Sequence, residues 1–300
     1  MRTSPLLLAF FALCTPQLCA QTTVGGPIHV DTDWTNAGSP YVLSSTITVT
    51  GGATLRIHPG TEVRLSAGDS IFVGDANLGA GTLVARGSET QPILFTSLTG
   101  APGSWESIRF TDDAVDTQLD SAGQYFSGSV LEKCVVEYGN EGSLYGAVST
   151  EYCSLLVQNC TLRANRGAAL QAYLSGSSAL ALRVRNTRFA SNEQALSIIG
   201  GASHVVSSCS FRHHGVPNGK AVAAIANAPF SVVEACMFEE NTGGTASLQL
   251  TGSSSNALVD RCFFALNVHS IAALSTSSSS VAIHRTDFQS NRASSTSLLS

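Results

Sequence analysis

Hydrophobic positions in the second half of the chain recur about every 25 residues. The recurring pattern is an aliphatic residue, two residues, Cys or Thr, one residue, an apolar residue, two residues and then usually Asn. Successive Cys or Thr positions are 26, 27, 22, 27, 26 and 24 residues apart. Self-similarity at a short, nearly fixed period is the sequence signature of a solenoid or another repeat fold. The seven copies begin at Leu131, Val157, Val184, Val206, Val233, Val259 and Ile283.

Each repeat contains three short apolar runs, separated by Ser, Gly, Asn or Pro. In one copy the runs cover residues 221–226, 230–233 and 236–239. Runs of this length are typical of strands, whereas a helix would need about 10 to 12 residues with a period of 3.6. Helical solenoids, leucine-rich repeats and propellers have other periods or consensus residues. The pattern therefore predicts an all-β fold, a single-stranded right-handed parallel β-helix with three short strands per coil.

Equivalent residues of successive coils should stack about 4.8 Å apart along the axis. We expect the Cys positions to form a buried packing column, and the Asn positions to form a column of corner amides that satisfies turn backbone. Stacked Cβ atoms are wider apart than the roughly 3.8 Å that a disulfide prefers, so disulfides within the column are disfavoured. Cys153 lies outside the column, and the sequence leaves open whether it is free or paired. The columns are Cys134, Cys160, Cys209, Cys236 and Cys262, and Asn165, Asn192, Asn241, Asn267 and Asn291.

Residues 27–110 contain short apolar runs of the same kind, at a less regular spacing. Gly51-Gly52, Pro59-Gly60 and Pro102-Gly103 mark turns between their apolar runs. We expect these residues to form the less regular N-terminal coils, and residues 131–292 to form the regular ones. The apolar runs lie at 47–49, 55–57, 63–65, 71–73, 83–85, 93–95 and 108–110.

Several motifs of this first half, taken with the later repeat, resemble the secreted bacterial right-handed parallel β-helix repeat proteins, the non-catalytic surface type of the pectate-lyase-like superfamily. The resemblance covers nearly all of residues 27–292. It implies the fold and export, but little about function. Many such relatives carry a C-terminal sorting or anchoring domain. For this chain two alternatives stay open: a fragment that lacks a C-terminal cap or anchor, or a chain with residues 294–300 as a loose tail. The motifs are Asp33-Trp34, Ser39-Pro40-Tyr41, Gly52-Ala53-Thr54-Leu55, Ile57-His58-Pro59-Gly60-Thr61, Gly81-Thr82-Leu83, Pro92-Ile93 and Gly103-Ser104-Trp105.

The N-terminus has the composition of a secretory signal peptide. Arg2 supplies the positive charge, residues 6–13 are apolar, and Ala20 provides a small residue at the expected cleavage site. The apolar run is too short to span a membrane, which takes about 20 residues. We therefore expect residues 1–20 to be removed, and residues 21–300 to form a soluble, monomeric β-helix domain that is secreted or held at the cell surface.

Composition agrees with tightly turned β structure. Apolar residues make up 43% of the chain, charged residues only 12%, and the net charge is −5. The apolar content is too high for a disordered chain, and the chain is not basic enough to indicate a nucleic-acid partner.

The charge is distributed unevenly along the chain. Residues 150–220 hold seven basic and two acidic side chains, whereas residues 21–149 hold five basic and fourteen acidic ones. Alternation along the strands predicts that five arginines point outward in three successive coils, where they could form a basic patch for an anionic polysaccharide or cell-surface glycan. The alternative is ordinary solvated surface. The five are Arg163, Arg183, Arg185, Arg188 and Arg212.

Catalytic and metal-binding motifs are hard to find. Asp112, Asp113, Asp116 and Asp120 could hold calcium, but their spacing matches no defined loop, so no cofactor is predicted. His214 takes the place of the corner Asn in its coil, which favours a structural role. No pair of carboxylates in strand register, as glycoside hydrolysis requires, is visible after residue 150.

The leading hypothesis is therefore a non-catalytic surface protein with a structural, adhesive or glycan-binding role. The alternative is a polysaccharide lyase or glycoside hydrolase that acts on an acidic polysaccharide. A third possibility is that the chain is the N-terminal part of a larger surface protein.

Overall fold

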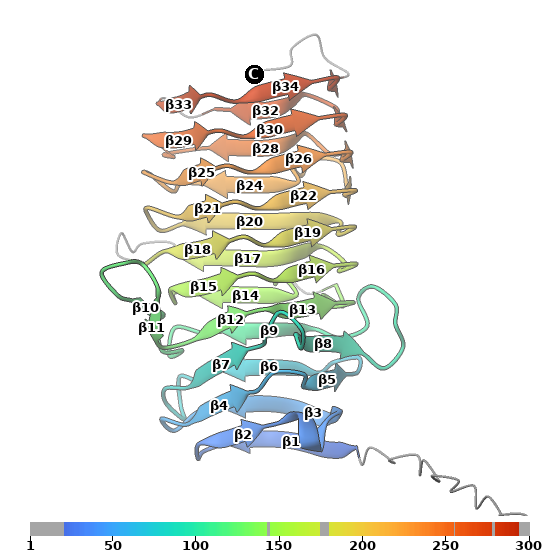
Figure 1. The fold of residues 1–300 in the computed structure, drawn as a ribbon, viewed down its shortest axis with the longest axis vertical. Helices are drawn as coiled ribbons and strands as arrows, with labels where there is room; N and C mark the ends of the chain where they lie inside the picture. The colour runs from blue at the N-terminus through green and yellow to red at the C-terminus, as the bar shows by residue number, and fades with distance from the viewer. Residues whose placement is uncertain (1–20, 143–144, 175–179, 255, 278–279, 294–300) are drawn as a thin grey trace, which may run out of the picture.

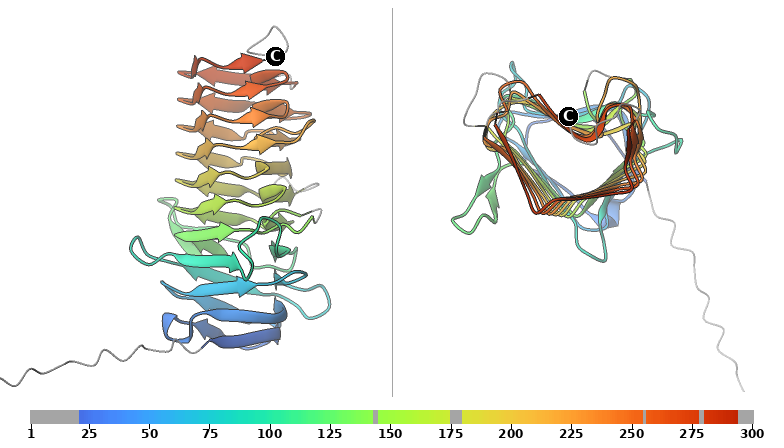
Figure 2. Two further views of the ribbon diagram at one scale, coloured as in Figure 1. Left: turned by 90° about the vertical axis from the view of Figure 1, so that its right-hand side faces the viewer. Right: turned by 90° about the horizontal axis from the view of Figure 1, so that it is seen from above.

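The chain forms a parallel β-solenoid in a computed structural model (Figure 1). The structure describes residues 21–142, 145–174, 180–254, 256–277 and 280–293. The predicted signal peptide, residues 1–20, and the Ser-rich tail lie outside them. Strands of successive coils pair in parallel from one end to the other, and seen from above the coils follow a common outline (Figure 2). The predicted parallel β-helix with three strands per coil is thus confirmed.

Each coil contributes one strand to each of three sheets, which we name I, II and III in chain order. Sheet I consists of β2 (Thr32–Trp34), β4 (Thr54–Ile57), β7 (Thr82–Arg86), β12 (Val130–Glu132), β15 (Leu155–Gln158), β18 (Leu182–Arg185), β21 (Val205–Ser207), β25 (Val232–Glu234), β29 (Ala257–Asp260) and β33 (Val281–His284). Sheet II consists of β5 (Glu62–Leu65), β8 (Ile93–Ser97), β13 (Cys134–Glu137), β16 (Thr161–Arg163), β19 (Arg188–Ala190), β22 (Ser210–Arg212), β26 (Met237–Glu239), β30 (Phe263–Ala265) and β34 (Asp287–Gln289). Sheet III consists of β6 (Ser70–Val73), β9 (Ser107–Phe110), β14 (Val148–Glu151), β17 (Ala168–Leu174), β20 (Gln194–Gly200), β24 (Ala223–Ala226), β28 (Ala246–Thr251) and β32 (Ala272–Thr276).

The remaining elements complete the coils or stand outside them. The first two long strands, β1 (Thr22–Ile28) and β3 (Tyr41–Val49), pair with each other, and β3 joins sheets II and III by pairing with both β5 and β6. A narrow fourth sheet consists of β23 (Gly215–Val216), β27 (Thr242–Gly243), β31 (Val268–His269) and β35 (Arg292–Ala293). An antiparallel hairpin consists of β10 (Gln118–Leu119) and β11 (Tyr125–Ser127), and one 3-10 turn covers Asn36–Gly38.

Like residues stack on like inside the lumen. Phe189, Phe211, Phe238, Phe264 and Phe288 form a column of parallel rings, with centroids 4.5 to 4.9 Å apart. Strand pairing places equivalent residues of adjacent coils directly over each other, so a residue type that fills the lumen once fills it again in the next coil. This column is the core of the C-terminal half.

The cysteine column lies beside the rings and contains no disulfide. All six described cysteines are free and buried, and Cys236 Sγ lies 3.4 Å from the carbonyl oxygen of Val206 in the preceding coil. Cys153, whose state the sequence left open, is also free. Burial raises the pKa of its thiol well above the ordinary range, which makes it an unreactive packing group.

The asparagine column forms a hydrogen-bonded ladder at the bend between sheets II and III. In one step, Asn241 Nδ2 donates to Asn267 Oδ1 at 2.9 Å and to the carbonyl of Phe211 at 2.9 Å. The backbone N–H of Asn241 donates to the same Asn267 oxygen. The residue before each ladder position has a positive φ, as at Glu240 (55°), so the ladder satisfies backbone groups that the sharp bend removes from the sheets.

Two features of the fold were not predicted. The strands begin at Thr22, five residues before the range assigned to the first coils, because β1 pairs along nearly its whole length with β3. The β10–β11 hairpin is the second, since it is an insertion between β9 and β12 that follows no repeat. In the part of the chain that the structure describes, no helix is long and apolar enough to cross a membrane.

Candidate functional site

The five arginines predicted as a basic patch are divided between two sheets. Arg183 and Arg185 lie on β18 of sheet I, whereas Arg163, Arg188 and Arg212 lie on strands of sheet II. A left-handed residue at the bend, such as Asn186 with a φ of 46°, separates the two groups. The strand columns therefore do not merge into one sheet surface as expected.

Most of these arginines already have partners. A carboxylate of an adjacent coil pairs with Arg163, whose Nη2 lies 2.7 Å from Glu137 Oε2. Arg212 pairs with Glu239 in the same way. Ligand binding by the five stays a prediction; among the described residues a carboxylate neutralises two of them, Arg163 and Arg212.

Arg185 holds the hairpin against sheet I. Its Nη1 donates to the carbonyl of Gly123 at 2.5 Å, and the guanidinium of Arg86 packs over the ring of Tyr125 at 5.0 Å. The neighbouring Arg183 is half-buried; burial first, and the charge of Arg185 second, hold the pKa of its guanidinium below the usual value. Arg185 and Arg86 thus position the hairpin, which is a structural insertion.

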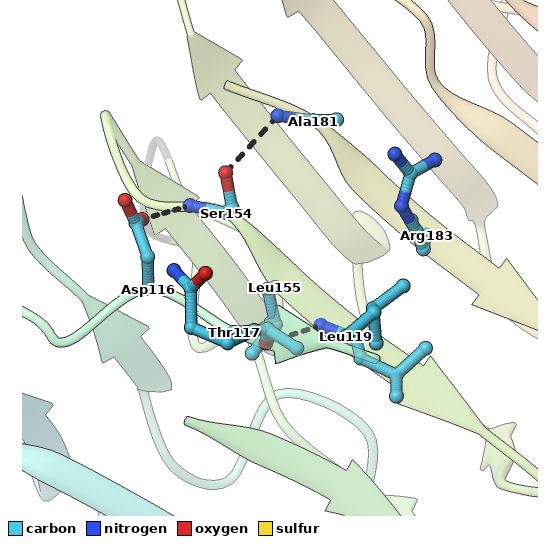
Figure 3. A pocket seen from close by; sticks show the side chains of 9 residues that line it. Asp116, Thr117, Leu119, Ser154, Leu155, Ala181 and Arg183 are labelled. Atoms are coloured by element: carbon cyan, nitrogen blue, oxygen red, sulfur yellow. Dashed lines mark hydrogen bonds between the residues drawn. The ribbon is translucent and has the colours of Figure 1, made fainter. Parts of the chain in front are cut away.

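A pocket of about 270 Å³ lies where the segment that leads into the hairpin crosses sheet I (Figure 3). Asp116 Oδ1 accepts the backbone N–H of Ser154 at 2.6 Å, and Ser154 Oγ accepts the N–H of Ala181 at 3.2 Å. Thr117 Oγ1 accepts the N–H of Leu156 at 2.9 Å. Asp116, Thr117 and Ser154 thus use their polar side-chain atoms to join neighbouring backbone segments. The pocket is therefore a structural contact between the hairpin segment and sheet I.

Two of the four aspartates predicted as a possible calcium loop, Asp116 and Asp120, accept hydrogen bonds from backbone N–H groups. Asp120 Oδ1 accepts the N–H groups of Ala122 and Gln124, at 2.9 and 2.8 Å, which closes the hairpin turn. Within the described ranges, no three His, Cys, Asp or Glu side chains gather so as to hold a metal ion. Whether the protein uses a cofactor stays untested.

A recess of about 240 Å³ opens on the outer face of sheet III. It lies over β14 and β17, and two tyrosines contribute to its wall. Alternation along β17 turns Leu170, Ala172 and Leu174 into the lumen and Gln171 and Tyr173 outward. We call this the tyrosine recess; its lining residues are Tyr145, Ser149, Thr150, Glu151, Gln171 and Tyr173.

Arg109 on β9 organises one side of the tyrosine recess. Its guanidinium lies 3.8 Å from the ring centroid of Tyr145, and its Nη2 donates to Glu151 Oε2 at 2.6 Å. The pairing neutralises the only carboxylate in the recess, and the stacking contact holds the Tyr145 ring. Tyr173 is 40% exposed and meets Tyr152 edge to face, at 5.7 Å between centroids.

The floor of the recess carries a polar group without a protein partner. Ser149 pairs in register with Arg109 on one side and Gln171 on the other. Its side chain is 1% exposed, and its Oγ has no hydrogen-bond partner among the residues described. Buried hydroxyls are nearly always hydrogen-bonded, so Ser149 is an exception to this rule directly beneath the recess.

A second recess, of about 340 Å³, adjoins the first, and we call it the cationic recess. It shares Tyr145 and Gln171 with the tyrosine recess, so the two form one groove over the bend and outer face of sheet III. The backbone comes close here because residue 146 is glycine: a Cβ would lie 2.7 Å from the carbonyl oxygen of Val148 and 3.0 Å from Gln171 Cβ. Its lining residues are Asn140, Gly142, Tyr145, Arg166, Gly167, Ala168, Gln171, Glu193, Gln194, Ser197 and Lys220.

Sequence reasoning missed this groove. Its residues come from four coils and from the bends between sheets, at positions where the repeat imposes no residue type. Alternation in β17 does predict that Gln171 and Tyr173 face outward, but nothing in the chain indicates that residues near 145 fold over them.

Comparison with known proteins agrees with the fold. Residues 146–299, slightly more than half of the chain, match the family described as the right handed beta helix region. Among solved structures, the A-module of mannuronan C-5 epimerase AlgE4 from Azotobacter vinelandii aligns at 10% identity over 91% of this chain and 88% of that chain, with a TM-score of 0.24. The A-module of the AlgE6 epimerase from the same organism aligns at 11% identity over 91% and 87%, with a TM-score of 0.21. No curated protein matches the sequence significantly. By its stacked coils and by this match, the chain belongs to the right-handed β-helix family.

Proposed function

We propose that this protein is a non-catalytic extracellular or cell-surface β-helix that binds a glycan in the groove on the outer face of sheet III. The observation that carries the proposal is the tyrosine recess, where two tyrosines stand beside an outward amide and above the orphaned hydroxyl of Ser149. The extracellular location rests on the signal-like residues 1–20.

The chemistry of the recess suits a sugar. A tyrosine ring offers an apolar face for the C–H groups of a pyranose and a phenol that can hydrogen-bond to a hydroxyl. Gln171 supplies an amide with both donors and an acceptor, and Ser149 Oγ can either donate or accept. A few placed polar groups on a concave, partly aromatic surface are the usual composition of a small-molecule site.

Binding should depend on Tyr173. In titrations by calorimetry against the best ligand from a glycan array, we expect Tyr173→Ala to weaken binding at least tenfold, because truncating an aromatic anchor at a site costs about 1 to 2 kcal/mol or more. Phe126→Ala is the matched control, since Phe126 is 74% exposed on the hairpin and lies outside the groove. Equal affinity of Tyr173→Ala and the unchanged protein would contradict the proposal.

An activity assay on the same protein distinguishes ligand binding from catalysis. Incubation with a panel of uronates and sulfated glycans, followed by chromatography of the products, detects a lyase or hydrolase. If a glycan is cleaved, and the Tyr145→Phe variant does not cleave it, the groove is an active site and the proposed binding function is wrong.

A further inference from the structure

The outward side of sheet I carries a column of residues that is apolar along most of its length. Strand pairing places these residues over each other in successive coils, and alternation along each strand turns them away from the lumen. Side chains that face water are mostly polar, so a long outward apolar column indicates a contact surface. From β7 to β33 the column consists of Val84, Val130, Leu156, Arg183, Val205, Val232, Leu258 and Ala282.

The chain itself covers the N-terminal part of this column. Val130 and Leu156 are fully buried, although neither belongs to the core inside the lumen. The segment that leads into the β10–β11 hairpin lies against this part: Thr117 Oγ1 accepts the backbone N–H of Leu156 at 2.9 Å, and Leu119 lines the same pocket as Leu156. The column is therefore already an interface within one chain at this level.

The C-terminal part of the column, which we call the apolar stripe, lacks such a cover among the described residues. Its members are half-buried or exposed, and Phe230, which is 57% exposed, lies at the bend before β25. A shallow depression of about 480 Å³ lies over Leu258 and Ala282. The nearby carboxylate of Asp260 is paired with Arg285, so the stripe requires no counter-charge from a partner. The apolar stripe consists of Val205, Val232, Leu258 and Ala282.

The hairpin carries an aromatic side chain that makes little contact with its own chain. Phe126 is 74% exposed, whereas the ring of Tyr125 beside it packs against the guanidinium of Arg86. The hairpin stands out from the coils (Figure 2), and Arg185 holds it at sheet I. Aromatic side chains are enriched in the buried centres of protein interfaces. One chain thus presents both an aromatic projection and an apolar stripe on the same sheet.

From this juxtaposition we infer that two copies of the chain pair through sheet I, with Phe126 of each copy packed on the apolar stripe of the other. A second copy is the occupant that the fold indicates, because the stripe continues the column on which the hairpin segment of the same chain is already seated. The sequence alone suggested a monomer, since no repeat position indicates this contact.

The heights of the two surfaces along the stack match. The hairpin contacts Arg86 on β7 and Arg185 on β18 and so spans four coils, and the stripe spans the next four, from β21 to β33. A twofold axis perpendicular to the stack, at the level between β18 and β21, therefore places each hairpin opposite the stripe of the partner. Such a contact uses the same surface on both copies and closes at two.

The inference does not rest on the glycan-binding function. Sheet III lies outside the contact, so the pair would present two grooves to a long polymer and one groove per chain to a short ligand. Pairing through sheet I therefore adds a way to bind long ligands more tightly without any new contact to the ligand.

Sedimentation velocity at about 1 to 200 µM protein tests the pairing, because two hairpin contacts bury less area than a permanent dimer and should give an affinity in the micromolar range. We expect the unchanged protein to shift from one copy to two as its concentration rises. Phe126→Ser and Leu258→Asp should each weaken this association by about tenfold or more, because each removes an apolar anchor from both contacts. The matched control is Leu266→Asp, which changes a 54% exposed leucine of the same coil at the bend after sheet II and should leave the association as it was.

A mixture of the two variants tests the reciprocal contact. In a mixed pair, Phe126 of the Leu258→Asp protein still meets an intact stripe on the Phe126→Ser protein, so the mixture should associate more strongly than either variant alone. Because Phe126 is exposed, Phe126→Ser keeps the test valid if Leu258→Asp lowers the thermal midpoint. A single copy at every concentration, association of Phe126→Ser equal to that of the unchanged protein, or assemblies that grow beyond two copies would each overturn the inference.

Discussion

At the scale of single residues, a histidine replaces asparagine at one position of the asparagine ladder. His214 occupies the ladder position between Asn192 and Asn241. Its Nδ1 lies 3.2 Å from the backbone nitrogen and 3.0 Å from the carbonyl oxygen of Asn192, and its own backbone N–H donates to Asn241 Oδ1 at 3.1 Å. Its Nε2 is buried without a partner among the described residues, whereas the amide of Asn241 reaches the carbonyl of Phe211. The imidazole therefore makes the backbone contacts of the ladder and leaves one nitrogen unsatisfied.

Burial lowers the pKa of His214 from 6.5 to about 4. The unfolded chain binds a proton at a higher pH than the folded chain does, so the stability that the neutral ring contributes is complete above about pH 6.5 and is lost as the pH falls toward 4. From this shift the loss is at most about 3 kcal/mol. Below pH 4 the group adds no further change.

We expect His214→Asn to flatten this part of the pH dependence. The free energy of unfolding of the unchanged protein, measured by urea denaturation, should fall between pH 6.5 and pH 4 by more than that of the variant. Since burial also lowers the pKa values of His204 and His269, part of the slope should remain in the variant. Identical profiles for the two proteins would show that His214 does not titrate with unfolding.

At the scale of strands and columns, the ring stack makes each phenylalanine depend on its position. Phe211 is fully buried between two rings, with centroids at 4.9 and 4.5 Å, whereas Phe288 in the last described coil contacts one ring and is partly buried. Removing a large side chain from a packed lumen costs the transfer free energy and leaves a cavity.

Phe211→Ala should therefore lower the free energy of unfolding by roughly 3 to 5 kcal/mol. Phe288→Ala is the matched control and should cost clearly less. Urea denaturation followed by circular dichroism measures both. Equal losses at the two positions would mean that the column does not stabilise the chain through contacts on both faces of each ring.

The columns could be predicted from sequence, and the groove could not, for one physical reason. Cys236 and Phe238 recur because parallel pairing places them over their equivalents in the next coil, where the lumen demands the same shape. Ser149 and Arg166 face outward or lie at a bend, where no neighbour requires a particular residue. The contact between Gln171 and the segment near Gly146 depends on how an irregular connection folds back, which leaves no periodic trace.

At the scale of the whole molecule, the chain is a linear stack in which a coil contacts mainly the coils above and below it, as in other solenoids. Paired charges on the outside join neighbouring coils, as Arg163 with Glu137 and Arg285 with Asp260 do. Some of the basic side chains in residues 150–220 are therefore used in ion pairs that join neighbouring coils. Arg183 on sheet I and Arg188 on sheet II form no ion pair with a described residue, so basic side chains without a carboxylate partner are spread over more than one sheet.

The most direct test of this account is hydroxyl-radical footprinting of the protein with and without its bound glycan. The account predicts that the glycan lowers the labelling of Tyr145 and Tyr173 and leaves that of Phe126 unchanged. Protection of residues on sheets I or II, with Tyr145 and Tyr173 labelled as before, would contradict it.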